Sequence, residues 1–84
     1  LVAFPGGFGT LDELFETLTL LQTGKTENVM VVLVGREFWE RLISWQLLIE
    51  NGLIGQEDLR LFHYAETAQE AWDLISRHNG VPSS

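Results

Sequence analysis

The chain has 84 residues, enough for one small domain. Five Lys and Arg against 12 Asp and Glu give a net charge of −7, which argues against binding a nucleic-acid polymer or an anionic membrane through bulk electrostatics. The absence of cysteine excludes a disulfide framework, a thiolate metal site and a cysteine nucleophile.

The first predicted elements are a short strand, a glycine loop and a helix. The wholly apolar stretch Leu1–Phe4 predicts a buried strand, and Pro5-Gly6-Gly7-Phe8-Gly9 predicts a tight loop. A helix is expected over about Thr10–Leu21, because apolar residues recur there at helical spacing, and Gly24 is expected to end it. These apolar residues are Leu11, Leu14, Phe15, Leu18 and Leu21.

A second strand and a second helix follow. The uninterrupted apolar run Val29–Val34 is typical of a parallel strand that is covered on both faces. A helix is predicted over about Glu37–Glu50, ended by Asn51-Gly52. Its expected apolar face carries Phe38, Leu42, Trp45 and Ile49.

The last predicted pair is a weaker strand over Leu59–Ala65 and a helix over Thr67–His78, closed by Asn79-Gly80. The inward positions of this helix are expected to be Ala68, Ala71, Trp72 and Ile75. We expect the three tryptophans, Trp39, Trp45 and Trp72, to be core or subunit-contact residues.

The alternation of strands and helices predicts an α/β domain with a parallel sheet and helices on its faces. Three strands are few for this class, and the chain starts inside a strand with no turn before it. We therefore expect residues 1–80 to be the C-terminal portion of a larger doubly wound domain, with residues 81–84 as a tail. The start carries no charged and apolar signal regions, so the expected location is cytoplasmic.

The glycine loop is the segment that predicts chemistry. It lies between a strand and a helix N-terminus, where ligands bind in open α/β sheets. Gly6, Gly7 and Gly9 allow the backbone to approach a ligand closely and to adopt positive φ where required. Free amides and the helix dipole favour an anion, and the Thr10 hydroxyl adds a donor. A phosphate monoester is the natural ligand.

A structural alternative exists for two of these residues. Thr10 and Glu13 have the spacing of a capping box, with Thr10 as N-cap and Glu13 three residues later. Thr67 and Glu70 have the same spacing without preceding glycines. The spacing alone therefore leaves both a capping role and a catalytic role open for Glu13.

The nine residues Pro5-Gly6-Gly7-Phe8-Gly9-Thr10-Leu11-Asp12-Glu13 match the pattern P-G-G-x-G-T-x-x-E and so resemble the LOG (Lonely Guy) family. These are cytokinin riboside 5′-monophosphate phosphoribohydrolases, often labelled lysine decarboxylases. The resemblance implies a Rossmann-like sheet and hydrolysis of the N-glycosidic bond of a nucleoside 5′-monophosphate, such as AMP, to a free base and ribose 5-phosphate. It spans nearly the whole chain but only the C-terminal half of the family's domain.

The resemblance also implies roles for particular residues. Gly6, Gly7, Gly9 and Thr10 would hold the 5′-phosphate, Glu13 would be the catalytic carboxylate, and Glu16 could orient Glu13 or the sugar, a solvated or structural role being equally open. No cofactor and no metal are expected. A homodimer or larger homo-oligomer is implied, with the predicted Phe38–Ile49 helix as a candidate interface. A decarboxylase using pyridoxal phosphate is not expected, because the single lysine, Lys25, follows the far end of the first helix.

One feature of the family is missing from these residues. Its catalytic arginine precedes the glycine motif, and Arg36, Arg41, Arg60 and Arg77 do not match it by position. We therefore expect enzymatic activity of a full-length parent and none of this fragment alone. The alternative function is a non-catalytic protein that binds a nucleotide or a phosphorylated cofactor.

Overall fold

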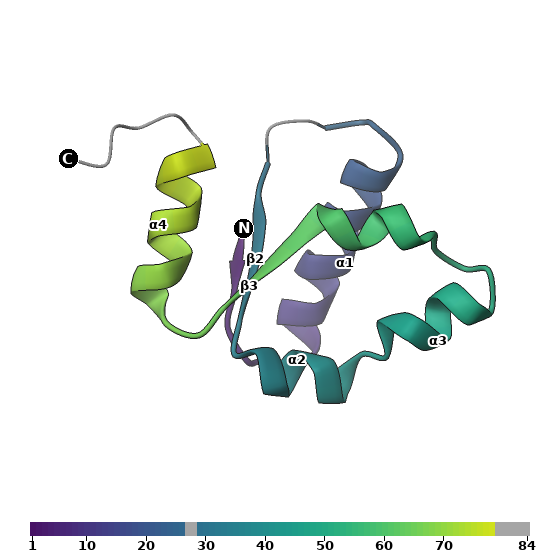
Figure 1. Ribbon diagram of the computed structural model, residues 1–84, viewed down its shortest axis with the longest axis horizontal. Helices are drawn as coiled ribbons and strands as arrows, with labels where there is room; N and C mark the ends of the chain where they lie inside the picture. Colours follow the sequence, from purple (N-terminus) through teal and green to yellow (C-terminus); the bar gives the residue numbers. More distant parts are fainter. Residues whose placement is uncertain (27–28, 79–84) are drawn as a thin grey trace.

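A computed structural model describes residues 1–26 and 29–78 (Figure 1). Three parallel strands form one sheet in the order β1 (Val2–Ala3), β2 (Val31–Val34) and β3 (Phe62–Ala65). In the register, Val32 of β2 lies between Val2 and His63. A helix follows each strand, so the predicted α/β class with a Rossmann-like parallel sheet is confirmed.

The sheet separates two apolar layers, with α1 and α4 on opposite sides in Figure 1. Helix α1 (Phe8–Gln22) packs on one face through Leu14, and α4 (Ala68–His78) packs on the other through Ala71. All four residues of β2 are buried, as expected for a strand that is covered on both faces. Within the described residues, none of the helices has the length and apolar character needed to cross a bilayer.

The end of α1 is the one that the sequence predicts. Gly24 follows the C-cap with a φ of +73°, the left-handed conformation that favours glycine. Its N–H donates to the carbonyl of Leu21 at 3.2 Å, and the N–H of Lys25 donates to that of Leu20 at 2.9 Å. This pair of bonds is a Schellman motif, which satisfies carbonyls that the helix leaves free.

The helix predicted over Glu37–Glu50 is wrong as a single element. The chain forms α2 (Arg36–Leu42) and α3 (Trp45–Glu50), separated by Ile43 in an extended conformation. The hydroxyl of Ser44 accepts a hydrogen bond from the N–H of Leu47 at 3.2 Å and so begins a new helix. The N-cap serine competes with helix continuation because its side chain satisfies a free amide.

The break changes which side chains are buried. Trp39 is fully buried, and its indole N–H donates to the carbonyl of Val34 at 3.0 Å. Phe38 and Leu42, which the prediction placed on the inward face, are 36% and 46% exposed. Trp45 is half-buried and stacks on Phe62 with ring centroids 4.5 Å apart. An interface role for the exposed apolar residues stays a prediction.

A 3-10 helix, η1 (Gln56–Leu61), occupies the start of the strand predicted over Leu59–Ala65. The carboxylate of Asp58 accepts from the N–H of Gly55 and from the amide of Gln22, both at 2.8 Å. The bond from Gln22 links η1 to α1. Its two residues are 36 positions apart in the sequence, so a local sequence pattern could not predict it.

The helix predicted over Thr67–His78 is confirmed as α4, and Thr67 is its N-cap, since its hydroxyl accepts from the N–H of Glu70 at 3.1 Å. The expected inward positions of Ala68 and Trp72 are wrong, because Ala68 is exposed and Trp72 is 61% exposed. Ala71 is buried with Leu74 and Ile75 packed near it, which turns Trp72 to the edge of the buried face. The predicted stop at Asn79-Gly80 and the tail 81–84 lie outside the described residues.

Candidate functional site

The glycine loop leads directly into the first turn of α1. Gly7 is the N-cap, with a φ of −101° and a ψ of −146°, and α1 begins at Phe8. The predicted capping role of Thr10 is therefore wrong: Thr10 is the third residue inside the helix. Because glycine can serve as an N-cap, α1 begins at Phe8, two residues before the predicted start at Thr10.

The start of α1 leaves several amides without a helical partner. The first helical hydrogen bond of α1 runs from the N–H of Leu11 to the carbonyl of Gly7 at 3.1 Å. The N–H groups of Phe8, Gly9 and Thr10 come before it in the chain and have no carbonyl one helical turn earlier to donate to. No side chain caps α1 at Gly7 in the described structure. These amides, at the positive end of the helix dipole, are suited to bind an anion.

The three glycines of the loop keep space free in two different ways. A Cβ at Gly6 would overlap the hydroxyl of Thr10 and lie 3.0 Å from the Thr10 Cβ, so the close approach of Thr10 requires glycine there. A Cβ at Gly7 or Gly9 would meet no described atom within 4 Å. Among the described glycines, positive φ occurs at Gly24, Gly35 and Gly52, so a positive φ does not account for the glycines of the loop, and close approach accounts for Gly6 alone.

Thr10 and Glu13 lie on consecutive turns of α1 and line one depression of about 250 Å³ together with Leu1–Pro5. The structure thus brings the predicted hydroxyl donor and the predicted carboxylate to the carboxyl end of β1. Glu13 is exposed and Thr10 is half-buried. Glu16 is also exposed but does not line this depression. The roles of these residues in binding and catalysis stay predictions.

The carboxyl ends of the three strands meet at one edge of the sheet. Gly35, directly after β2, has a φ of +91°, and a Cβ there would lie 3.5 Å from the side chain of Pro5. Its N–H donates to the carbonyl of Ala65 at the end of β3, at 2.8 Å. The turn after β2 therefore joins the glycine loop to β3.

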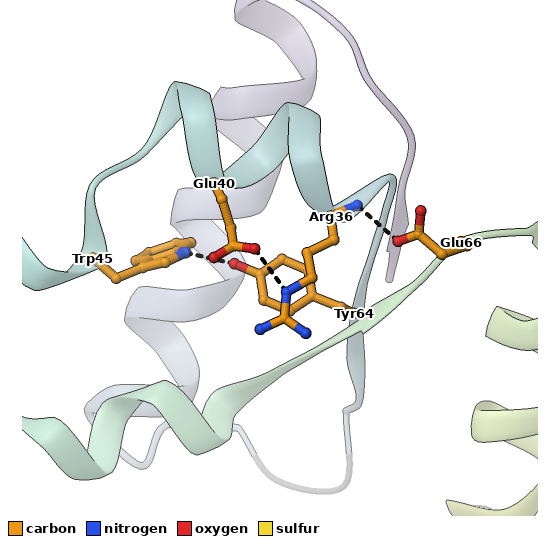
Figure 2. A network of polar contacts seen from close by, with 5 residues as sticks. All are labelled: Arg36, Glu40, Trp45, Tyr64 and Glu66. Atoms are coloured by element: carbon orange, nitrogen blue, oxygen red, sulfur yellow. Dashed lines mark hydrogen bonds and ion pairs between the residues drawn. The ribbon is translucent and has the colours of Figure 1, made fainter.

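Arg36 starts α2 at this edge and forms a polar network that the sequence analysis did not predict (Figure 2). Its Nε donates to Glu40 at 2.7 Å, and its backbone N–H donates to Glu66 at 3.1 Å. The guanidinium lies 4.9 Å from the centre of the Tyr64 ring, whose hydroxyl accepts from the indole of Trp45 at 2.9 Å. The spacing of Arg36 and Glu40 on one helix was the available signal.

The electrostatics of this network are local. The hydrogen bond to Glu40 raises the pKa of Arg36, and burial raises the pKa of Tyr64. Arg36 and Glu40 are both half or more exposed, so solvent screens their ion pair and it contributes little to stability. Arg36 does not line the depression of Thr10 and Glu13, and none of the described residues lining that depression is Lys or Arg.

Other groups do not converge on the depression. Lys25 follows the C-terminal end of α1, roughly 20 Å along the helix from the glycine loop. This distance does not support a Schiff-base lysine beside the loop. In residues 1–26 and 29–78, no group of three or more His, Cys, Asp and Glu side chains is arranged to hold a metal ion.

The fold and the loop define a class: an α/β protein with a glycine loop that leads into a helix at the carboxyl edge of a parallel sheet. A family profile described as "Possible lysine decarboxylase" matches residues 1–75. The chain therefore belongs to this family, the LOG family.

Several curated proteins are similar to this chain. It is 35% identical over 80 residues to a bifunctional cytokinin biosynthesis protein of Fusarium pseudograminearum (strain CS3096). This alignment covers 94% of this chain and 16% of that protein. It is 32% identical over 78 residues to the probable cytokinin riboside 5′-monophosphate phosphoribohydrolase LOGL3 of Oryza sativa subsp. japonica, covering 92% of this chain and 37% of that protein.

A third relative is the cytokinin riboside 5′-monophosphate phosphoribohydrolase LOG1 of Arabidopsis thaliana, 31% identical over 87 residues, with 98% of this chain and 41% of that protein covered. The chain thus spans less than half of the length of each of these three relatives.

Proposed function

We propose that this chain is the C-terminal portion of a parent protein that hydrolyses the N-glycosidic bond of a nucleoside 5′-monophosphate, either a cytokinin riboside 5′-monophosphate or AMP. The products are a free base and ribose 5-phosphate. The observation that carries the proposal is the shared depression of Thr10 and Glu13 beside the unpaired amides of α1. The activities for which the rice and Arabidopsis relatives are named support the same reaction class.

Phosphate binding is the first step of the proposed mechanism. The amides of Phe8, Gly9 and Thr10 donate to the phosphate oxygens, and the Thr10 hydroxyl adds a fourth donor. Gly7 and Gly9 leave the approach to these amides open, since a Cβ there meets no described atom. Holding the phosphate fixes the ribose, which brings its anomeric carbon near the carboxylate one turn further along α1.

Glu13 performs the second step. Cleavage of an N-glycosidic bond passes through an oxocarbenium-like state, in which positive charge develops on the ribose ring. The Glu13 carboxylate stabilises this charge and positions the attacking water. The described residues that line the depression include no Lys or Arg, and the rest of the parent would supply the catalytic arginine that the family resemblance implies.

The test is Glu13→Gln in the parent protein. The substitution keeps the size of the side chain and removes its charge. We expect release of adenine from AMP to fall by about a hundredfold or more, as for loss of an electrostatic catalytic group. The affinity for ribose 5-phosphate, measured by calorimetry, stays within about twofold, because the phosphate contacts are made by the preceding turn.

Glu16→Gln is the matched control, since Glu16 is an exposed carboxylate one turn further along α1 and lies outside the depression. Turnover in the Glu13→Gln variant equal to that of the parent protein would contradict the catalytic role. Tight binding of AMP without release of base by the unmodified parent would instead favour a nucleotide-binding protein of the same superfamily.

A further inference from the structure

Phe4 is an exposed aromatic residue at the candidate site. It follows β1 directly, and its side chain is 48% exposed, whereas the preceding Ala3 is 3% exposed. Leu1 and Val2 each pack against one of the two apolar clusters, and Phe4 belongs to neither of them. Core packing among the described residues therefore does not account for the aromatic ring at this position.

Phe4 lines the same depression as Thr10 and Glu13. It supplies the aromatic ring among the described lining residues, which are otherwise aliphatic or polar. The depression thus has an apolar aromatic wall from the end of β1 and a polar wall from α1. Phe8, in contrast, is 92% exposed at the start of α1 and does not line the depression.

The chemistry of a nucleotide matches these two walls. A nucleoside monophosphate has an anionic end, a ribose and a planar heteroaromatic base. The base is bonded to the anomeric carbon, so when this carbon lies near Glu13 the base is within reach of the other residues that line the depression, Phe4 among them. An aromatic side chain favours a planar base by stacking, whichever base it is.

We infer that Phe4 contacts the base of the bound nucleotide and selects nucleoside monophosphates over plain sugar phosphates. This inference rests on the proposed function and adds a substrate contact to it. Phe4 is a specificity residue in this assignment: it binds the part of the substrate that ribose 5-phosphate lacks.

The experiment compares two ligands that differ by the base. The Kd of AMP and the Kd of ribose 5-phosphate are measured by calorimetry in the parent protein carrying Glu13→Gln, which is expected to slow turnover. Adding Phe4→Ala is expected to raise the Kd of AMP at least about fivefold and to leave the Kd of ribose 5-phosphate within about twofold. Phe4→Leu, which keeps apolar bulk without a ring, follows Phe4→Ala, and Phe4→Tyr restores AMP affinity.

Trp72→Ala is the matched control, because Trp72 is a 61% exposed aromatic residue on α4. An equal change in both Kd values for Phe4→Ala, or no change in either, overturns the inference. If Phe4→Ala does not fold, the comparison of Phe4→Leu with Phe4→Tyr decides it. Failure of the parent itself to bind AMP and ribose 5-phosphate would instead refute the proposed function, so the two failures are distinguishable.

Discussion

The hydroxyl of Thr10 occupies the space that a Cβ on Gly6 would need. This contact joins the glycine loop to the first turn of α1 and keeps the Thr10 side chain at the edge of the depression that Glu13 lines. Glycine is required at position 6 because of the neighbouring side chain, and not because of a positive φ. The packing of Thr10 against Gly6 therefore links the loop to the start of the helix.

Gly6→Ala is expected to lower the free energy of unfolding by about 1–3 kcal/mol, the usual cost of an added methyl group in a packed site. Urea denaturation followed by circular dichroism measures the change. The double variant Gly6→Ala/Thr10→Ala removes the overlapping hydroxyl and is expected to recover part of the loss. A double variant no more stable than Gly6→Ala would show that the contact with Thr10 is not the cause.

Gly9→Ala is expected to have opposite effects on stability and binding. The added Cβ meets no described atom and lies in the first turn of α1, so the free energy of unfolding rises by up to about 1 kcal/mol. The same methyl group adds bulk at the turn that is proposed to bind the phosphate, so binding of ribose 5-phosphate is expected to weaken. Denaturation and calorimetry on one sample test both effects, and unchanged ligand affinity would argue against phosphate binding at this turn.

Asp58 is expected to make stability depend on acid pH. Hydrogen bonds from the N–H of Gly55 and the amide of Gln22 lower the pKa of its carboxyl from the ordinary value of 3.8. A carboxyl whose pKa is lowered by folding contributes stability above its unfolded pKa, and this contribution is lost as the pH falls through the folded pKa. The loss therefore begins near pH 3.8 and continues below it.

Asp58→Asn removes this ionisation. Between about pH 5 and pH 2, the free energy of unfolding of the variant should decline less steeply than that of the unmodified chain. Gln22→Ala, which removes one of the two donors, should give an intermediate slope. Identical slopes for the unmodified chain and Asp58→Asn would show that the bonds to Asp58 contribute no pH dependence.

Local patterns in the sequence predicted those elements whose causes are local. The β-branched run of β2, the helical spacing of α1 and the glycine that ends it each depend on residues close together in the chain. Thr10 and Thr67 each begin a sequence pattern typical of a helix N-cap. In the structure Thr67 is the N-cap of α4, whereas Thr10 lies inside α1. In the structure the N-cap is Gly7 and α1 begins at Phe8, which the capping pattern does not predict.

Predictions that depended on packing were less successful. Trp72 was expected to be buried because its spacing fits an apolar helix face. In the structure α4 packs on the sheet through Ala71, Leu74 and Ile75, and Trp72 is exposed. The sequence analysis missed the break at Ile43 and Ser44 because the apolar pattern continues across it. The structure breaks the helix there, with Trp39 buried in α2 and Ser44 capping α3.

The sequence by itself determined the alternation of strands and helices and the position of the glycine loop before the first helix, because side-chain periodicity and glycine content act over a few residues. Only the tertiary structure decided that Phe4 and Glu13 line one depression. It also decided that Arg36 lies over the ring of Tyr64 and outside that depression. These relationships depend on strand order and register, which bring Pro5, Gly35 and Ala65 to one edge although up to 60 residues separate them.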